Sequence, residues 1–179
     1  MMKENFIDIT LQYFKKTIPF FLTIIIILFN FMLIHLPLSH FFKPNLALCC
    51  LYFWVLYRPD LFGISSVVLL GFMIDVLSGE PFGINVCVLL FTYISTSFMT
   101  QYIDTSPFSN IWMYFLPVAF GTFFFKWILF SIYYKSFLSV FYVCVSYFVT
   151  ILIYPLIAKL NIFIQEHYLT DKEMLHEQE

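Results

Sequence analysis

A short polar turn between two apolar runs organises this sequence: residues 71–83 read GFMIDVLSGEPFG. At about 3.6 residues per helical turn, Gly71, Asp75 and Ser78 fall on one face, which is small and polar, whereas the residues between them are bulky and apolar. The following letters SGEP predict a tight turn whose proline can open the next helix. The stretch therefore predicts a hairpin of two helices.

The chain on both sides of this hairpin is equally apolar. Hydrophobic residues make up 61% of the 179 positions and charged residues 11%, with a mean hydropathy of +0.89. Soluble proteins carry roughly 25% charged residues, and a soluble domain would expose many of the 25 phenylalanines to water. We expect an all-α integral membrane protein with about six transmembrane helices in one bundle. The apolar segments are 18–36, 41–57, 61–77, 82–100, 111–133 and 137–158.

The second of these segments is the weakest. Its apolar core from Leu46 to Tyr57 is short of a full span. The helix must therefore begin near Phe41, with Lys43 snorkelling and Pro44 starting the regular helix, or else cross only partly. A five-crossing bundle, with this segment lying in the interface, is the alternative to six crossings.

The basic residues predict the orientation in the membrane. Six crossings put both termini on one side, where six lysines or arginines face two on the other. The terminal side carries Lys3, Lys15, Lys16, Arg58, Lys159 and Lys172, and the opposite side carries Lys43 and Lys135. By the positive-inside rule, both termini are cytoplasmic. We expect a cytoplasmic N-terminal segment over 1–17, the bundle over 18–158 and a cytoplasmic acidic tail over 159–179.

Asp75 and Lys126 are the two ionisable residues expected inside the membrane. A carboxylate facing lipid costs about 3 kcal/mol or more, so Asp75 should point into the bundle or towards a polar cavity. We favour a structural pin that holds the hairpin over a proton or solute site, because transporters usually place several ionisable groups along a path. Lys126 lies in the same half of the membrane, where it either pairs with Asp75 or snorkels outward.

Motifs for other chemistry are missing from the sequence. It contains no Gly-rich phosphate loop, nucleophile elbow or zinc motif, and its four histidines lack metal-ligand spacing. Its cysteines lie in apolar runs, and its basic residues form no stripe for nucleic acid. Thr92 and its polar neighbours in segment 82–100 are better suited to hydrogen bonding between helices. We therefore expect no enzyme activity, metal, cofactor or nucleic-acid partner.

Two motifs give the sequence a family resemblance. The block Gly71-x-x-x-Asp75-x-x-Ser78-Gly79-x-x-x-Gly83, between two apolar segments, resembles the most recognisable block of MreD, the rod shape-determining membrane protein of bacteria. Lys43-Pro44-Asn45, opening a segment that contains Tyr52 and Trp54, is similar to the opening of that family's second segment. The specific match covers residues 43 to 100.

The resemblance implies a non-catalytic subunit of the machinery for lateral cell-wall growth in the bacterial inner membrane. Its partners would be a single-span MreC-like protein, the MreB cytoskeleton and peptidoglycan synthases. The implied fold is similar to the substrate-binding components of energy-coupling vitamin transporters. The interaction and structural residues would be Pro44, Asn45, Gly71, Asp75, Ser78, Gly79, Gly83 and Lys126. The alternative function is a small-solute transporter component with a polar pocket near Asp75.

Overall fold

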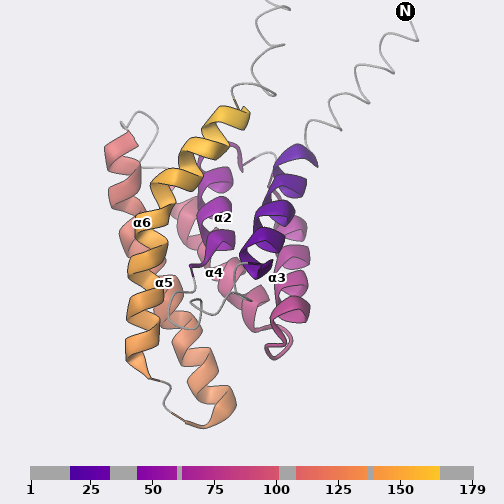
Figure 1. Ribbon diagram of the computed structural model, residues 1–179, viewed down its shortest axis with the longest axis vertical. Helices are drawn as coiled ribbons and strands as arrows, with labels where there is room; N and C mark the ends of the chain where they lie inside the picture. Colours follow the sequence, from indigo (N-terminus) through magenta and orange to yellow (C-terminus); the bar gives the residue numbers. More distant parts are fainter. Residues whose placement is uncertain (1–16, 33–43, 60–61, 101–107, 137–138, 166–179) are drawn as a thin grey trace, which may run out of the picture.

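Six helices form the described part of the computed structural model, which covers residues 17–32, 44–59, 62–100, 108–136 and 139–165. These residues contain no strand, so the all-helical prediction is confirmed (Figure 1). The helices are a first helix over Thr17–Met32, α2 over Leu46–Tyr57, α3 over Ile64–Ser78, α4 over Ile84–Thr100, α5 over Phe108–Tyr134 and α6 over Val140–Gln165. Most of the expected N-terminal segment and the tail after residue 165 lie outside the described residues.

Helix length separates two of the six helices from the others. Within the described residues, only α5, over Ile111–Tyr134, and α6 are long and apolar enough to cross a membrane by length and composition. The 12 residues of α2 extend about 18 Å, and the 15 residues of α3 about 22 Å, against a hydrocarbon core of about 30 Å. The expected number of helices is present, but four of them are shorter than a full span.

Helix α2 is the centre of the bundle. Every residue from Leu46 to Val55 is buried, as expected for a short helix that is apolar on all sides. The helix packs against α4 and α6. Helix α2 begins only at Leu46, after the cap residue Asn45, so Pro44 does not start the regular helix as expected.

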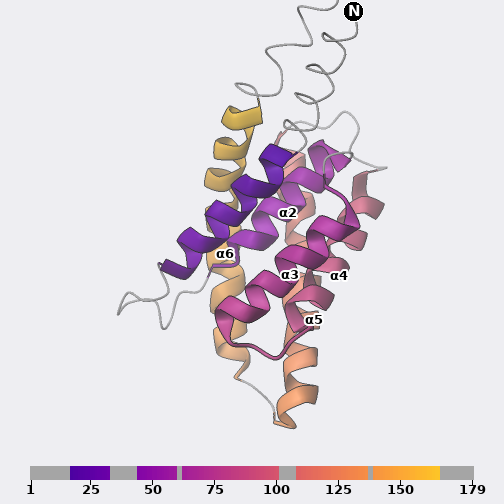
Figure 2. The same cartoon turned by 90° about the vertical axis from the view of Figure 1, so that its right-hand side faces the viewer.

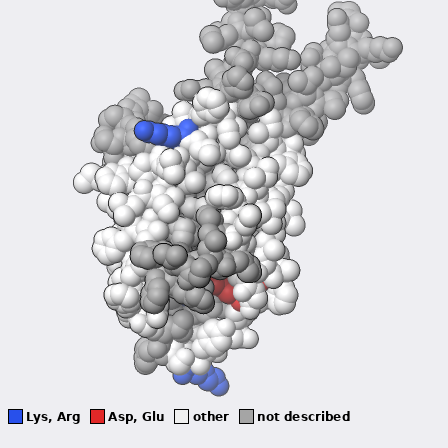
Figure 3. Space-filling model, in the orientation of Figure 1, with Lys and Arg blue, Asp and Glu red and all other residues white. Residues whose placement is uncertain are grey.

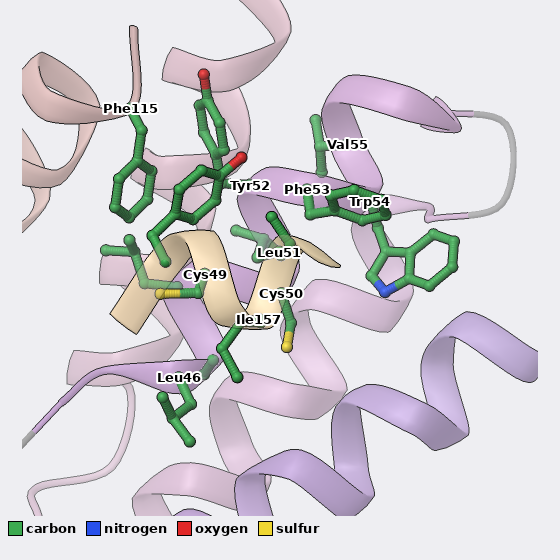
Figure 4. Packing of buried hydrophobic residues seen from close by; sticks show 14 of the residues in the cluster. Leu46, Cys49, Cys50, Leu51, Tyr52, Phe53, Trp54, Val55, Phe115 and Ile157 are labelled. Carbon is green, nitrogen blue, oxygen red and sulfur yellow. The ribbon is translucent and has the colours of Figure 1, made fainter. Parts of the chain in front are cut away.

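Aromatic rings join α2 to the two long helices. Tyr52 on α2 contacts Phe115 on α5 edge to face, with ring centroids 5.0 Å apart, and Phe115 stacks on Tyr154 of α6 at 4.1 Å (Figure 4). The Tyr52 hydroxyl donates a hydrogen bond of 3.1 Å to the carbonyl of Ile111. Such pairs add about 0.5–1.5 kcal/mol each beyond the area they bury. They fix the depth of α2 between α5 and α6.

The lengths and tilts of the helices decide where the turn between α3 and α4 lies. The first helix and α3 run obliquely across α5 and α6 (Figure 2). Helix α6 ends at the same end of the bundle at which the first helix begins (Figure 1), and it continues past the expected boundary at residue 158. At the opposite end, α5 and α6 extend beyond the turn between α3 and α4 (Figure 1). The hairpin turn therefore lies against the flank of α5.

Candidate functional site

The turn between α3 and α4 is shaped by two glycines. Gly79 ends α3 with φ at 64°, and Gly83 precedes α4 with φ at 93°. Residues with a side chain seldom adopt these left-handed conformations, so both positions favour glycine. The Ser78 hydroxyl donates a 2.6 Å hydrogen bond to the carbonyl of Ile74 and so remains within α3. The predicted tight turn is present, but Pro81 does not open the next helix as expected, since α4 begins only at Ile84.

Asp75 connects the end of α3 to the beginning of α4. It is only 1% exposed, and its Oδ2 atom accepts a 2.7 Å hydrogen bond from the backbone amide of Gly83. Its Oδ1 atom accepts bonds from the backbone amide and the side-chain amide of Asn85, at 3.0 Å and 2.8 Å. The first amides of a helix lack helical partners and carry partial positive charge. The carboxylate therefore caps α4 from a neighbouring helix.

Asn85 extends this contact into a hydrogen-bond network that links three helices and the turn. Its side-chain nitrogen also donates to Glu80 Oε2 at 2.6 Å, and its Oδ1 atom accepts a 2.9 Å bond from the ammonium of Lys126. Lys126 Nζ in turn lies 3.1 Å from Glu80 Oε2 and 5.4 Å from the ring centre of Phe130. We call Asp75, Glu80, Asn85 and Lys126 the polar cluster. It joins α3, the turn, α4 and α5.

The ion pair between Asp75 and Lys126, one of the two alternatives for this lysine, is not formed in the structure. Lys126 pairs with Glu80, and Asn85 lies between the ammonium and the Asp75 carboxylate. The reason is geometric, because Asp75 turns towards the amides that open α4, whereas Glu80 lies in the turn that faces α5. Lys126 does not simply snorkel outward either, since its ammonium is bound on the protein and the side chain is 24% exposed.

Glu80 and Asn85 are the two members of the cluster that the sequence interpretation missed. Glu80 was treated only as part of a polar turn, although it is the nearest acidic residue to the intramembrane lysine in the structure. Asn85 had a detectable signal, because an amide side chain at the start of an otherwise apolar helix needs a partner. Ten residues separate it from Asp75 across the turn.

Gly71 lies where α3 crosses α4. A Cβ atom added there would lie 2.6 Å from Val86 Cα and 2.9 Å from Val86 N, which are backbone atoms that cannot turn aside. The small face predicted for the hairpin therefore does meet another helix, and that helix is α4. Further along, Thr92 of α4 and Thr122 of α5 place their hydroxyl oxygens 3.0 Å apart, as expected for interhelical hydrogen bonding.

Pro44 and Asn45 tie the start of α2 to two other helices. Asn45 caps α2 by accepting a 3.2 Å bond from the amide of Leu48, and its own amide donates to the Thr150 hydroxyl on α6 at 3.0 Å. The Pro44 carbonyl accepts a 3.0 Å bond from the side chain of Asn30 on the first helix. Lys43, which opens the predicted motif, lies outside the described residues.

The two predicted motifs meet at one cavity of about 560 Å³. Its wall includes Pro44 and Asn45 from the first motif, Ser78 from the second, and Lys126. The cluster members Glu80 and Asn85 also line it, with the aromatic residues Phe31, Phe123, Trp127, Phe130 and Tyr142. The remaining predicted residues, Gly71, Asp75, Gly79 and Gly83, form the hairpin behind this wall. The volume falls within the range of about 300–1,000 Å³ that is usual for ligand pockets.

The composition of the cavity limits its chemistry. Within the described residues, no three histidine, cysteine or acidic side chains come together as metal ligands. The buried carboxylate of Asp75 accepts three hydrogen bonds within the hairpin, and the partly exposed carboxylate of Glu80 is held by Lys126. The arrangement suits holding helices together and binding, since its charged groups are occupied by one another.

Comparison with protein families identifies the family of the chain. The family model described as rod shape-determining protein MreD matches residues 13–164, a range that includes all five stretches described except residue 165. The chain belongs to the MreD family. The resemblance seen in the hairpin and in the Pro44-Asn45 motif is thereby confirmed. MreD proteins are bacterial membrane proteins, in agreement with the apolar helices here, and membership supports a role in determining rod shape.

Comparisons with curated proteins and with solved structures give no match. The similarity to the substrate-binding components of vitamin transporters therefore stays a prediction. The description of the MreD family is one of shape determination, a structural task in the cell, and it names no reaction.

Proposed function

We propose that the protein is a non-catalytic inner-membrane subunit of the bacterial cell-elongation complex. It supports rod shape and lateral peptidoglycan synthesis by binding an MreC-like single-span partner, beside MreB and the peptidoglycan synthases. The match to the MreD family over residues 13–164 carries this proposal. The polar cluster adds support, because its charged groups bind one another and the starts of helices rather than being arranged around a reacting atom.

The surface supports a multi-pass position in the inner membrane. The face seen in Figure 3 is largely free of charged atoms, with basic residues towards its two ends and one small acidic patch. Large apolar side chains are exposed along α5 and α6, for example Phe120, Phe148 and Leu152. The short helices lie within the bilayer because they pack, directly or through one another, on these two long helices. Because the first helix begins and α6 ends at the same end of the bundle (Figure 1), both termini are placed on the cytoplasmic side, as the basic residues favour.

Packing within the hairpin supports a partner site elsewhere on the bundle. The Gly71 face is filled by α4 at Val86, so a partner helix has no access to it without separating the hairpin. Exposed apolar faces on the first helix and α3, as well as on α5 and α6, are available to the partner. There van der Waals packing, rather than burial from water, provides the attraction between helices.

Purification from the native host tests the proposed partner. The full chain, tagged at its C-terminus, is extracted in a mild detergent, and the co-purifying proteins are identified by mass spectrometry. We expect a single-span protein resembling MreC in comparable amount, and we expect Phe82→Ala, which truncates an exposed side chain in the hairpin turn, to retain it. An intact, folded protein that is isolated without such a partner contradicts the proposal.

The cavity supports a second candidate, a small-solute transporter component. Several polar side chains converge on a space of about 560 Å³ beside Asp75, as a solute site requires. The two candidates differ in the effect of Asp75→Asn. A variant that keeps its fold and its partner but abolishes uptake of a solute favours transport, whereas a variant that loses stability favours the structural role.

A further inference from the structure

The polar cavity adjoins an apolar recess between the two long helices. This recess has a volume of about 240 Å³ and is lined by Phe120, Phe123, Phe124, Trp127, Val140, Val143, Cys144 and Tyr147. Phe123, Trp127 and Val143 line both spaces, so the recess adjoins the cavity. One end of the combined space is polar and the other is aromatic and aliphatic. Three residues that line the recess, Phe120, Phe124 and Val140, are exposed on the surface of the bundle, so the recess opens towards lipid.

The polar end has spare capacity to accept hydrogen bonds. Asn30 donates its side-chain amide to the Pro44 carbonyl, while its Oδ1 atom is buried and has no partner among the described residues. Glu80 Oε2 receives Asn85 and Lys126, whereas Oε1 receives only a longer 3.4 Å contact from Lys126. A carboxylate oxygen can accept two hydrogen bonds, and a buried acceptor without a partner is costly. A ligand that brings hydrogen-bond donors would satisfy both atoms.

The charge of the polar cluster selects among such ligands. Asp75 and Glu80 contribute two carboxylates, and Lys126 contributes one ammonium, so the cluster carries a formal charge of −1. The side-chain nitrogen of Asn85 already donates to Asp75 and Glu80, and the ammonium of Lys126 already donates to Glu80 and to the Asn85 Oδ1 atom. An anionic group would meet carboxylates with few free donors, whereas an ammonium would be attracted and could donate three hydrogen bonds.

We propose that this space binds one membrane lipid whose head group carries a primary ammonium. The ammonium binds at the acceptors of Glu80 and Asn30, and an acyl chain lies in the recess between α5 and α6. The occupant is a lipid rather than a soluble amine because the apolar recess adjoins the polar cavity. The lipid assays use the chain without its partner, so a failure of lipid binding and a failure of partner binding are distinguishable.

Native mass spectrometry of the full chain tests the proposal. The protein in dodecyl maltoside micelles is mixed with equal amounts of palmitoyl-oleoyl phosphatidylethanolamine, phosphatidylcholine and phosphatidylglycerol. We expect one phosphatidylethanolamine molecule to be retained about tenfold over phosphatidylglycerol, which corresponds to about 1.4 kcal/mol. Phosphatidylcholine, whose quaternary ammonium has no N–H donor, should be retained less well than phosphatidylethanolamine.

Two variants locate the site. Glu80→Gln removes the charge at the head-group end and should reduce phosphatidylethanolamine retention about tenfold, whereas Leu152→Ala, on the exposed face of α6, should leave it unchanged. Equal retention of the ethanolamine and glycerol lipids, or equal retention by Glu80→Gln and the wild type, overturns the proposal. Displacement of the lipid by glycerophosphoethanolamine, which has no acyl chain, overturns the choice of a lipid over a soluble amine.

A second measurement needs no change in the polar cluster. Trp127 lines both the cavity and the recess, whereas Trp54 is fully buried. Trp112 is replaced by phenylalanine, so that Trp127 is the tryptophan that reports on the site. Phosphatidylethanolamine with a brominated acyl chain should quench the tryptophan fluorescence of this variant, and the quenching should reach its limit at a low amount of lipid. Brominated phosphatidylglycerol should not quench it at the same amount. Equal quenching by the two lipids contradicts a selective site, even if Glu80→Gln fails to fold.

Discussion

Replacing Asp75 by asparagine keeps the shape of the side chain and removes one of its two acceptor oxygens. The remaining oxygen can keep the two bonds from Asn85, but the new amide group then faces the backbone amide of Gly83 at the 2.7 Å position, donor against donor. A hydrogen bond to a charged group contributes about 1.5–3 kcal/mol, and an amide left without a partner costs about 1–3 kcal/mol. The lost attraction to the start of α4 adds about 0.3–1 kcal/mol.

These contributions overlap, and together they predict that Asp75→Asn lowers the free energy of unfolding by about 2–4 kcal/mol. The assay is reversible unfolding in mixed micelles of increasing SDS content, followed by far-ultraviolet circular dichroism. Ser78→Ala is the matched control, since it removes one bond within α3 and should cost less than about 1 kcal/mol. If Asp75→Asn unfolds within about 0.5 kcal/mol of the wild type, the carboxylate does not hold the hairpin and the reasoning is refuted.

Three further predictions follow from the packing, the ion pair and the topology. Gly71→Ala forces α3 and α4 apart and should lower the free energy of unfolding by about 1–3 kcal/mol in the SDS titration. Gly121→Ala is the control and should be nearly neutral, because its new Cβ atom would meet only the edge of the movable Phe91 ring, at 3.4 Å. Glu80→Gln and Lys126→Met should each lower the free energy of unfolding by more than half of the loss seen in the double variant, because each single change leaves the other charge without its partner. Losses that simply add in a double-mutant cycle would contradict the pairing. In a chain without native cysteines, Lys135→Cys should react with a membrane-impermeant thiol reagent in intact cells, and a cysteine at either terminus should not; labelling of the C-terminus from outside would favour five crossings.

The hairpin could be predicted from the sequence because its signals are local. Gly71 and Asp75 are one helical turn apart, and the glycines at 79 and 83 mark the positive backbone angles of the turn. Asn45 after Pro44 is likewise a local capping signal. Each of these residues controls the backbone within a few positions of itself, so periodicity and turn chemistry were sufficient to find them.

The partners of the charged residues depend on the tertiary packing. Nothing near Lys126 in the sequence indicates that α5 would meet the turn at Glu80, 46 residues earlier. The central position of α2 was also hidden, because an apolar segment of 12 residues has the same composition whether it faces lipid or other helices. The cavity where Asn45 and Ser78 meet exists only once all six helices are packed.

Depletion of the protein in a rod-shaped bacterial host tests the central claim most directly. Cells are followed by microscopy while the protein is removed, with a plasmid copy of the wild type as the control, and the activities of the individual wall-synthesis enzymes are measured in membranes from the same cells. The account predicts that depleted cells become round while those enzymes remain chemically competent, and that the plasmid copy restores rods. Depleted cells that keep their rod shape and instead require a vitamin for growth would contradict it.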